Sequence, residues 1–316
     1  MQPITGGSAC GDFPAGDSPP RRSDGHTYPV ASPRIRRREN GLGAWRDFAG
    51  SRRRAMLAAF QTKFRRRNAA LMAHYVDLHA HYLPALDDGA TDRQMSLQMV
   101  RAIAALGFSD LYATPHQRAG MFMPARTAID AAFAAVKEDA AAAGVGATLG
   151  LGAENFWDTV LHDRLRQRAV PSYGGGATFL FEVGTQMMPA GIENELFQLR
   201  VSGYLPVMAH PERYLPVQRD LALAERLARH AALMVDLGAL DGAHGKQEMK
   251  TARKLVQEGL ATAAASDIHR PEDQTSVAAG MAWIRKQLGD GVLTTMLDEN
   301  PRRMLAGELP ETPLPR

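Results

Sequence analysis

The sequence predicts an α/β fold, a distorted (β/α)7 barrel of parallel strands, and three observations carry this prediction. Seven short apolar runs follow one another from residue 74 onward. Amphipathic stretches with helical periodicity separate most of these runs. Polar residues able to bind metal follow nearly every run. Strands that alternate with helices pair in parallel, so their carboxyl ends meet at one mouth of a barrel.

The apolar runs have strand length, and glycines follow several of the helical stretches, as is usual at helix ends. The predicted strands are 75–79, 109–113, 147–151, 178–183, 204–208, 232–236 and 261–265. The predicted helices are 92–106, 125–143, 190–201, 218–230 and 246–258. A doubly wound sheet and an eight-stranded barrel are the alternatives. No Gly-x-Gly-x-x-Gly follows the first strand, which argues against a dinucleotide-binding sheet.

The chain divides into three predicted parts. Residues 1–73 form a basic extension, largely rich in Gly, Pro, Ser and Arg, which we expect to be disordered. Residues 74–306 form the barrel, and the Pro-rich residues 307–316 form a flexible tail. Residues 1–72 hold 14 Lys and Arg against 5 Asp and Glu, a net charge of +9. Because the whole chain carries +3, residues 73–316 carry −6.

Three interpretations of the basic extension stay open. It binds nucleic acid or anionic lipid, it is a solvated tail without a specific role, or the true translation start lies downstream at Met72. No apolar stretch approaches the roughly 20 residues needed to span a bilayer, and no secretory signal pattern is present. The single Cys10 excludes an internal disulfide. We therefore expect a cytoplasmic protein.

The candidate metal ligands stand at the ends of the predicted strands. His79 and His81 close the first strand two residues apart, a spacing that places both imidazoles on one side. Surface histidines would be the alternative for this pair alone, but the chain repeats the pattern. The full set is His79, His81, Asp88, His116, Glu154, Glu182, His210, Asp267 and His269. Nine ligands exceed the needs of one ion and suit up to three ions that share carboxylates. Mixed nitrogen and oxygen donors suit Mn²⁺, Fe²⁺ or Zn²⁺.

Several motifs resemble one known family. They are Asp77-Leu78-His79-Ala80-His81, the run from Leu83 to Ala90 with Asp87-Asp88-Gly89, Ala113-Thr114-Pro115-His116, Gly120-Met121-Phe122, Gly152-Ala153-Glu154, Ala209-His210-Pro211-Glu212-Arg213-Tyr214 and Ala265-Ser266-Asp267-Ile268-His269. In this order they resemble the polymerase-and-histidinol-phosphatase (PHP) superfamily. Within it, they are similar to the bacterial manganese-dependent protein-tyrosine phosphatases of capsule and exopolysaccharide operons. The resemblance covers about residues 74–306.

The resemblance implies three metal sites and a phosphate-binding pair. The first ion would bind His79, His81, Glu154 and Asp267, the second Glu154, Glu182 and His210, and the third Asp88, His116 and His269. Mn²⁺ would be the usual metal. Arg213 and Arg118 match the positions that hold the substrate phosphate, and they stand with Asp267 as the catalytic candidates. The alternative for Arg213 is a surface salt bridge with Glu212 or Asp220. Asp236 is either a further acidic group at the mouth or a helix cap.

The resemblance also implies a function, hydrolysis of phosphotyrosine on the tail of a bacterial tyrosine kinase. A small-molecule phosphatase acting on histidinol phosphate, or a phosphodiesterase, is the alternative within the same superfamily. A metal-binding module without turnover is a third hypothesis, which the retention of all nine ligand-type residues disfavours. Cysteine-based phosphatase chemistry is excluded, because Gly16 stands six residues after Cys10 where such a loop requires Arg.

Overall fold

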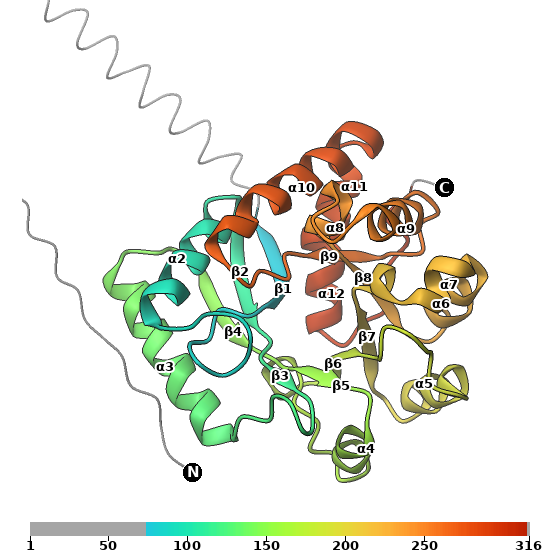
Figure 1. The fold of residues 1–316 in the computed structure, drawn as a ribbon, viewed down its shortest axis with the longest axis horizontal. Helices are drawn as coiled ribbons and strands as arrows, with labels where there is room; N and C mark the ends of the chain where they lie inside the picture. The colour runs from blue at the N-terminus through green and yellow to red at the C-terminus, as the bar shows by residue number, and fades with distance from the viewer. Residues whose placement is uncertain (1–73, 315–316) are drawn as a thin grey trace, which may run out of the picture. The chain divides into compact units, whose positions relative to one another are not determined.

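Parallel strands form the centre of the molecule, and helices lie around them (Figure 1). The computed structural model describes residues 74–314, so the predictions for residues 1–73 fall outside the described residues. The strands are β1 (Tyr75–Ala80), β2 (Phe108–Ala113), β3 (His116–Gln117), β4 (Thr148–Leu151), β5 (Glu154–Phe156), β6 (Thr178–Glu182), β7 (Leu205–Ala209), β8 (Ala232–Asp236) and β9 (Ala263–Ala265).

The seven predicted strands are present, and two of them are followed by short strands that the sequence did not predict. β3 follows β2 after Thr114-Pro115, and β5 follows β4 after Gly152-Ala153. Pro115 has no N–H to give to a ladder, which explains the first break. At Gly152 a Cβ would lie 2.8 Å from the ring of Tyr173, so only glycine fits there. The strands consequently form two sheets, ordered β1-β2-β4 and β3-β5-β6-β7-β8-β9.

The first and last strands meet, which brings the two sheets round toward a barrel. Asp267 N–H donates to the carbonyl of His79 at 2.9 Å, and His81 N–H donates to the carbonyl of Ile268 at 3.0 Å. A parallel bridge between Ala80 and Ile268 accompanies these bonds. Every strand pair in the two sheets is parallel. The predicted α/β fold with parallel strands is confirmed, and the broken strands are its distortion.

Helices follow most strands and cover the outside of the sheets (Figure 1). They are α2 (Arg93–Ala104), α3 (Arg126–Ala142), α4 (Thr159–Arg166), α5 (Ile192–Val201), α6 (Leu215–Arg219), α7 (Leu221–Ala228), α8 (Leu237–Asp241), α9 (Lys246–Gln257), α10 (Gln274–Leu288), α11 (Asp290–Thr294) and α12 (Asn300–Leu305). The prediction of one helix over 218–230 was wrong. Asp220 separates α6 from α7, because its carboxylate caps α7 by accepting from Ala222 N–H at 3.0 Å. None of the helices within residues 74–314 is long and apolar enough to cross a membrane.

The buried apolar residues form an inner and an outer cluster. The inner cluster contains strand residues such as Leu180, Val207 and Met234, together with Met304 of α12. Side chains two residues apart on a strand point to the same face. In β6, for example, Leu180 belongs to the inner cluster, and Glu182 points to the same side two residues later. β8 and β9 likewise continue from inner apolar residues to an acidic residue. The outer cluster lies between the strands and helices. The packed interior therefore ends at a polar mouth.

The Pro-rich end, for which the sequence predicts flexibility, contacts the barrel at two points. The buried side chain of Asn300 donates to the carbonyl of Glu311 at 2.7 Å and accepts from its N–H at 2.8 Å. Leu314 packs against the outer cluster.

A buried carboxylate at Asp77 ties β1 to the segment after β9. Asp77 Oδ2 accepts from the hydroxyl of Ser266 at 2.5 Å, and Oδ1 accepts from Ser266 N–H at 3.0 Å. Burial raises the pKa of Asp77 to about 6, against the opposing effect of these hydrogen bonds, so the group is still ionised at neutral pH. This contact joins the first strand, β1, to the segment that follows the last strand, β9.

We predict that Asp77→Ala lowers the free energy of unfolding by about 2–4 kcal/mol, because the N–H and O–H of Ser266 lose their buried acceptor. Urea denaturation in the presence of a chelator measures this change without a contribution from bound metal. Asp130→Ala is the matched control, since among residues 74–314 this exposed carboxylate pairs only with the exposed Arg126, and a change within about 0.5 kcal/mol is expected. Equal stability of the two variants would contradict the role of Asp77.

Candidate metal centre

All nine predicted ligands lie together at the carboxyl ends of the strands. Each is placed by the end of a strand or by the loop that follows it: His79 lies in β1, His81 and Asp88 after it, His116 in β3, Glu154 in β5, Glu182 in β6, His210 directly after β7, and Asp267 and His269 after β9. Their donor atoms form four groups that could each hold a metal ion. The groups are His79-His81-Asp267, His79-Glu154-His210, His116-Glu154-Glu182 and His81-Asp88-His116-His269.

Glu154 is the hub of this cluster. Its Oε2 lies 3.3 Å from His79 Nε2, 3.4 Å from His81 Nε2 and 3.0 Å from His116 Nδ1. Its Oε1 lies 2.9 Å from His210 Nε2. The side chain is almost fully buried. One carboxylate thus faces four imidazoles from the ends of three strands, β1, β3 and β7.

The remaining donors extend the cluster on both sides of the hub. His79 Nε2 lies 3.2 Å from Asp267 Oδ1, and His79 Nε2 lies only 3.1 Å from His81 Nε2. Asp88 Oδ1 lies 3.3 Å from His116 Nε2 and 3.4 Å from His269 Nε2. The side chain of Asp88 is half exposed, so this end of the cluster opens to solvent.

The donor set fits divalent transition-metal ions. Three donor atoms, His116 Nδ1, Glu154 Oε2 and Glu182 Oε1, are buried without a hydrogen-bond partner among the described residues. Buried polar atoms are rarely left unpaired, because the loss of hydration costs free energy. The Nε2 atoms of His79 and His81 also face each other, 3.1 Å apart. A cation between these atoms would satisfy all of them.

Asp87 orients two of the candidate ligands, a role that the sequence analysis missed. Its Oδ2 lies 2.9 Å from His81 Nδ1, which leaves Nε2 to face the cluster. The same oxygen accepts from His116 N–H at 3.1 Å, and Oδ1 accepts from Gly89 N–H at 3.1 Å. The position directly before Asp88, in the Asp-Asp-Gly motif, was the available signal.

Two ligand residues adopt backbone conformations that L-amino acids rarely use. His210 has φ +32° and Asp267 has φ +47°. Such residues cost about 1–3 kcal/mol each and persist where the surrounding structure compensates. Both follow the last residue of an inner strand, β7 and β9, where the chain must turn away while the side chain faces the mouth.

The imidazoles of the cluster attract protons. Burial lowers the pKa of His116, but the nearby carboxylates of Asp88, Glu182 and Glu154 outweigh this effect and raise the pKa to about 10. Burial also disfavours the charged form of His81, yet the carboxylate of Asp87 holds its pKa well above the ordinary value. The cluster therefore stores positive charge on its histidines, which a metal ion would displace.

The pKa values of the two central carboxylates, Glu154 and Asp267, shift downward. Burial would raise the pKa of Glu154 and of Asp267, but the charge of His79 and further histidine partners hold both well below the ordinary range. Both groups are therefore ionised at neutral pH, and this anionic state is the one that binds metal.

Arg213 lies beside the cluster and is held by partners other than those expected. Its Nη2 donates to Asp236 Oδ2 at 2.6 Å and to Asp267 Oδ2 at 2.5 Å, and it lies 3.0 Å from His244 Nε2. The alternative of a surface bridge to Glu212 or Asp220 was wrong. The carboxylate of Glu212 instead turns inward and accepts from Asp236 N–H at 2.9 Å.

Asp236 combines the two roles that the sequence left open. Its Oδ1 caps α8 by accepting from Gly238 N–H at 2.6 Å, and its Oδ2 binds Arg213. The same Oδ2 also contacts His244 Nε2 very closely. His244 was missed because it lies in a loop without a motif, and nothing in the sequence places it beside Arg213.

A hollow of about 200 Å³ opens over the cluster. Arg118 and Arg213 both line it, together with Met121, Phe122 and most of the candidate ligands. The guanidinium of Arg118 lies 4.1 Å from the ring centre of Phe156, a cation–π contact, rather than against a candidate ligand. The hollow therefore has two arginines on its wall and the donor cluster at its floor.

Comparison with known proteins identifies the family. The model of the family described as "Capsular polysaccharide synthesis, CpsB/CapC" matches residues 75–306. Tyrosine-protein phosphatase YwqE of Bacillus subtilis (strain 168) is 28% identical over 235 residues, which cover 74% of this chain and 92% of YwqE. Tyrosine-protein phosphatase CpsB of Streptococcus pneumoniae is 23% identical over 74% of this chain and 99% of its own length.

A solved structure agrees with the sequence comparison. It belongs to a set of crystal structures of YwqE and CpsB, which are described as metal-dependent tyrosine phosphatases. It superposes with a TM-score of 0.69 at 28% identity and covers 76% of this chain and 99% of its own. The matched region of the family model runs from β1 to the end of α12. The chain therefore belongs to the CpsB/CapC family of capsular polysaccharide synthesis.

Proposed function

We propose that this chain is a metal-dependent protein-tyrosine phosphatase that removes phosphate from the phosphotyrosine tail of a bacterial tyrosine kinase and so regulates capsule or exopolysaccharide synthesis. The observation that carries this proposal is the hollow that opens over the nine-residue donor cluster, with seven of the nine candidate ligands and two arginines lining it. The relatives named as tyrosine phosphatases support the choice of substrate.

The metal assignment is part of this proposal. The first ion binds His79, His81, Glu154 and Asp267, the second Glu154, Glu182 and His210, and the third Asp88, His116 and His269. The short distances within the four donor groups support it, although these groups divide the same nine residues differently. We propose Mn²⁺, which mixed imidazole and carboxylate sites accept; Fe²⁺ and Zn²⁺ suit the same donors. Bound divalent ions supply Lewis acidity, which lowers the pKa of water and neutralises phosphoryl charge.

The chain's own residues bind and orient the phosphate. Arg213 lines the hollow from a position that Asp236 and Asp267 fix, and its buried Nε has no partner among the described residues. Arg118 lies at the same hollow and can close on a phosphate from its stacked position over Phe156. Guanidinium groups bind two phosphate oxygens at once. A tyrosine leaving group, with an ordinary pKa of about 10, departs with little help from an acid.

We also propose that residues 74–306 carry this activity, because every candidate ligand falls within them. The basic extension contributes none. The lone Cys10 agrees with a reducing compartment, and on this basis we assign the activity to the cytoplasm.

The purified, manganese-loaded protein is expected to hydrolyse phosphotyrosine peptides at least about tenfold faster than matched phosphoserine peptides, because a phenolate leaves more easily than an alkoxide. Steady-state rates of phosphate release measure this ratio. Histidinol phosphate and a phosphodiester complete the panel. A clear preference for either of these would replace the proposed substrate with the small-molecule or diesterase alternative.

We predict that Arg213→Ala lowers kcat/KM on a phosphotyrosine peptide by about 30- to 1,000-fold, since a charge-assisted contact that strengthens in the transition state contributes about 2–4 kcal/mol. Metal content, measured by elemental analysis, should stay unchanged. Arg219→Ala is the control, because Arg219 is exposed at the end of α6 and does not line the hollow. Normal activity of Arg213→Ala would exclude the arginine from phosphate binding.

Metal binding should release protons. Since the pKa of His116 is raised to about 10 and that of His81 is also raised, both imidazoles are largely protonated at pH 7.5 until metal displaces the protons. Addition of Mn²⁺ to chelator-treated protein in weak buffer should release at least about one proton per chain, and the affinity should fall as the pH falls. His162→Ala, outside the cluster, should behave like the parent chain. Tight binding without proton release would contradict the protonated state of these histidines in the metal-free protein.

A further inference from the structure

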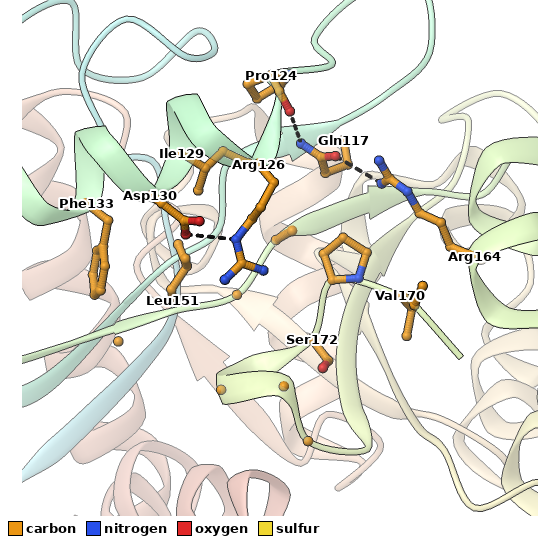
Figure 2. Close-up of a pocket in the computed structure, with 18 of the residues that line it drawn as sticks. Gln117, Pro124, Arg126, Ile129, Asp130, Phe133, Leu151, Arg164, Val170 and Ser172 are labelled. Atoms are coloured by element: carbon orange, nitrogen blue, oxygen red, sulfur yellow. Dashed lines mark hydrogen bonds and ion pairs between the residues drawn. The ribbon is translucent and has the colours of Figure 1, made fainter. Parts of the chain in front are cut away.

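A second pocket, of about 950 Å³, lies behind the strands that carry His116 and Glu154 (Figure 2). It is much larger than the hollow over the metal centre. Its walls are α3, the strand β4 with the following Gly152-Ala153, and the segment 168–176 after α4. Its volume is typical of sites for small organic ligands, which usually occupy 300–1,000 Å³.

The pocket and the metal centre use opposite faces of the same strands. His116 and Gln117 are neighbours in β3, and their side chains alternate, so His116 faces the donor cluster while Gln117 lines the pocket. In the same way Glu154 faces the cluster, while the preceding Ala153 lines the pocket. The two sites share no lining residue. The pocket is therefore a separate site.

The pocket carries an excess of positive charge. Arg126, Arg164 and Arg168 line it against a single carboxylate, Asp130, which pairs with Arg126 at 2.8 Å. Figure 2 shows Arg126 and Arg164 on two sides of the pocket, with Arg164 donating to the amide oxygen of Gln117 at 2.9 Å. Within residues 74–314, no carboxylate lies within ion-pair distance of Arg164, and burial lowers the pKa of its guanidinium. Besides Gln117, the guanidinium contacts only the neutral sulfur of Met123, at 3.7 Å, among the described residues. A partly buried cation with neutral partners is suited to bind an anion.

Arg168 occupies a position where helices normally place glycine. It follows α4 with φ +53°, its N–H donates to the carbonyl of Leu165 at 3.2 Å, and the N–H of Ala169 donates to the carbonyl of Arg164 at 2.8 Å. These two bonds define the Schellman motif, whose left-handed residue is usually glycine. The exposed guanidinium makes no side-chain hydrogen bond or ion pair within the described part of the chain. The chain therefore tolerates backbone strain that keeps a free cation at the pocket.

The rest of the lining is apolar. Ile129 and Phe133 of α3, Leu149 and Leu151 of β4, and Val170 contribute apolar side chains to the lining. A ligand that fills the pocket thus meets both arginine side chains and an aliphatic and aromatic surface.

We propose that this pocket binds a small organic phosphate of nucleoside-diphosphate size. The three arginines bind the phosphate oxygens, and the apolar wall contacts the organic body. Guanidinium forks bind phosphate oxygens in pairs, so three of them suit a diphosphate better than a single carboxylate. The site is independent of the proposed catalytic centre, and its test requires no turnover.

Isothermal titration of the protein as purified tests the proposal with three probes. Adenosine 5′-(α,β-methylene)diphosphate carries both the charge and the organic body and resists hydrolysis. Pyrophosphate carries only the charge, and adenosine only the body. The methylene diphosphate should bind at least about tenfold tighter than either fragment, because the pocket contacts both parts. Absence of binding at millimolar concentration, or equal affinity for pyrophosphate, would overturn the proposal.

Variants locate the binding. Arg168→Gly should weaken binding of the methylene diphosphate at least about tenfold, while its midpoint of thermal unfolding stays equal or rises, because glycine relieves the left-handed strain. Phe133→Ala should weaken the nucleotide but leave pyrophosphate unchanged. Arg219→Ala, remote from the pocket, should bind like the parent chain. Undiminished binding to Arg168→Gly would contradict the proposal. Displacement of the nucleotide by a phosphotyrosine peptide would place it at the catalytic hollow and would also contradict the proposal.

Discussion

The burial of one carboxylate, that of Glu154, is the constraint on which the rest of the centre depends. An ionised carboxylate is expensive to bury unless positive charge surrounds it. Here the imidazoles of His79, His81, His116 and His210, from the ends of three strands, all lie within 3.4 Å of the Glu154 oxygens, and raised pKa values favour the charged forms of His81 and His116. A divalent ion between these groups would neutralise the carboxylate more completely and leave the imidazoles neutral. The same geometry therefore explains both the packing of the mouth and its affinity for metal.

Breaks in the strands and left-handed residues at strand ends position the candidate ligands. The strand breaks before β3 and β5 bring His116 and Glu154 into the second sheet, where they pair in register. The left-handed residues His210 and Asp267 turn the chain away at the ends of β7 and β9. The contact of Asp77 with the segment after β9 fixes the seam between the first and last strands. Strain at the mouth is thus balanced by well-packed strands beneath it.

The seven main strands and the nine candidate ligands could be predicted from the sequence, because the strands are short apolar runs and the ligands stand at their ends. The break at Gly152 could not be predicted, since it depends on the ring of Tyr173 that packs against this glycine. At Pro115 the missing N–H was a local signal for the break, but the short strand β3 beyond it depends on pairing with β5. Asp220 looked like part of one helix because an N-cap inside an amphipathic stretch does not disturb its periodicity. Asp87 was within a motif, but its contacts with the candidate ligands His81 and His116 depend on the tertiary structure. His244 reaches Arg213 only through the fold, and the basic pocket behind β3 and β5 joins segments far apart in the chain.

Anomalous diffraction from crystals of the manganese-loaded protein tests the central claim most directly. The account predicts more than one manganese peak at the carboxyl ends of the strands, with at least one peak about 2.0–2.3 Å from a Glu154 oxygen and from histidine nitrogens of the cluster. Absence of manganese from the cluster, or peaks confined to surface carboxylates, would contradict it.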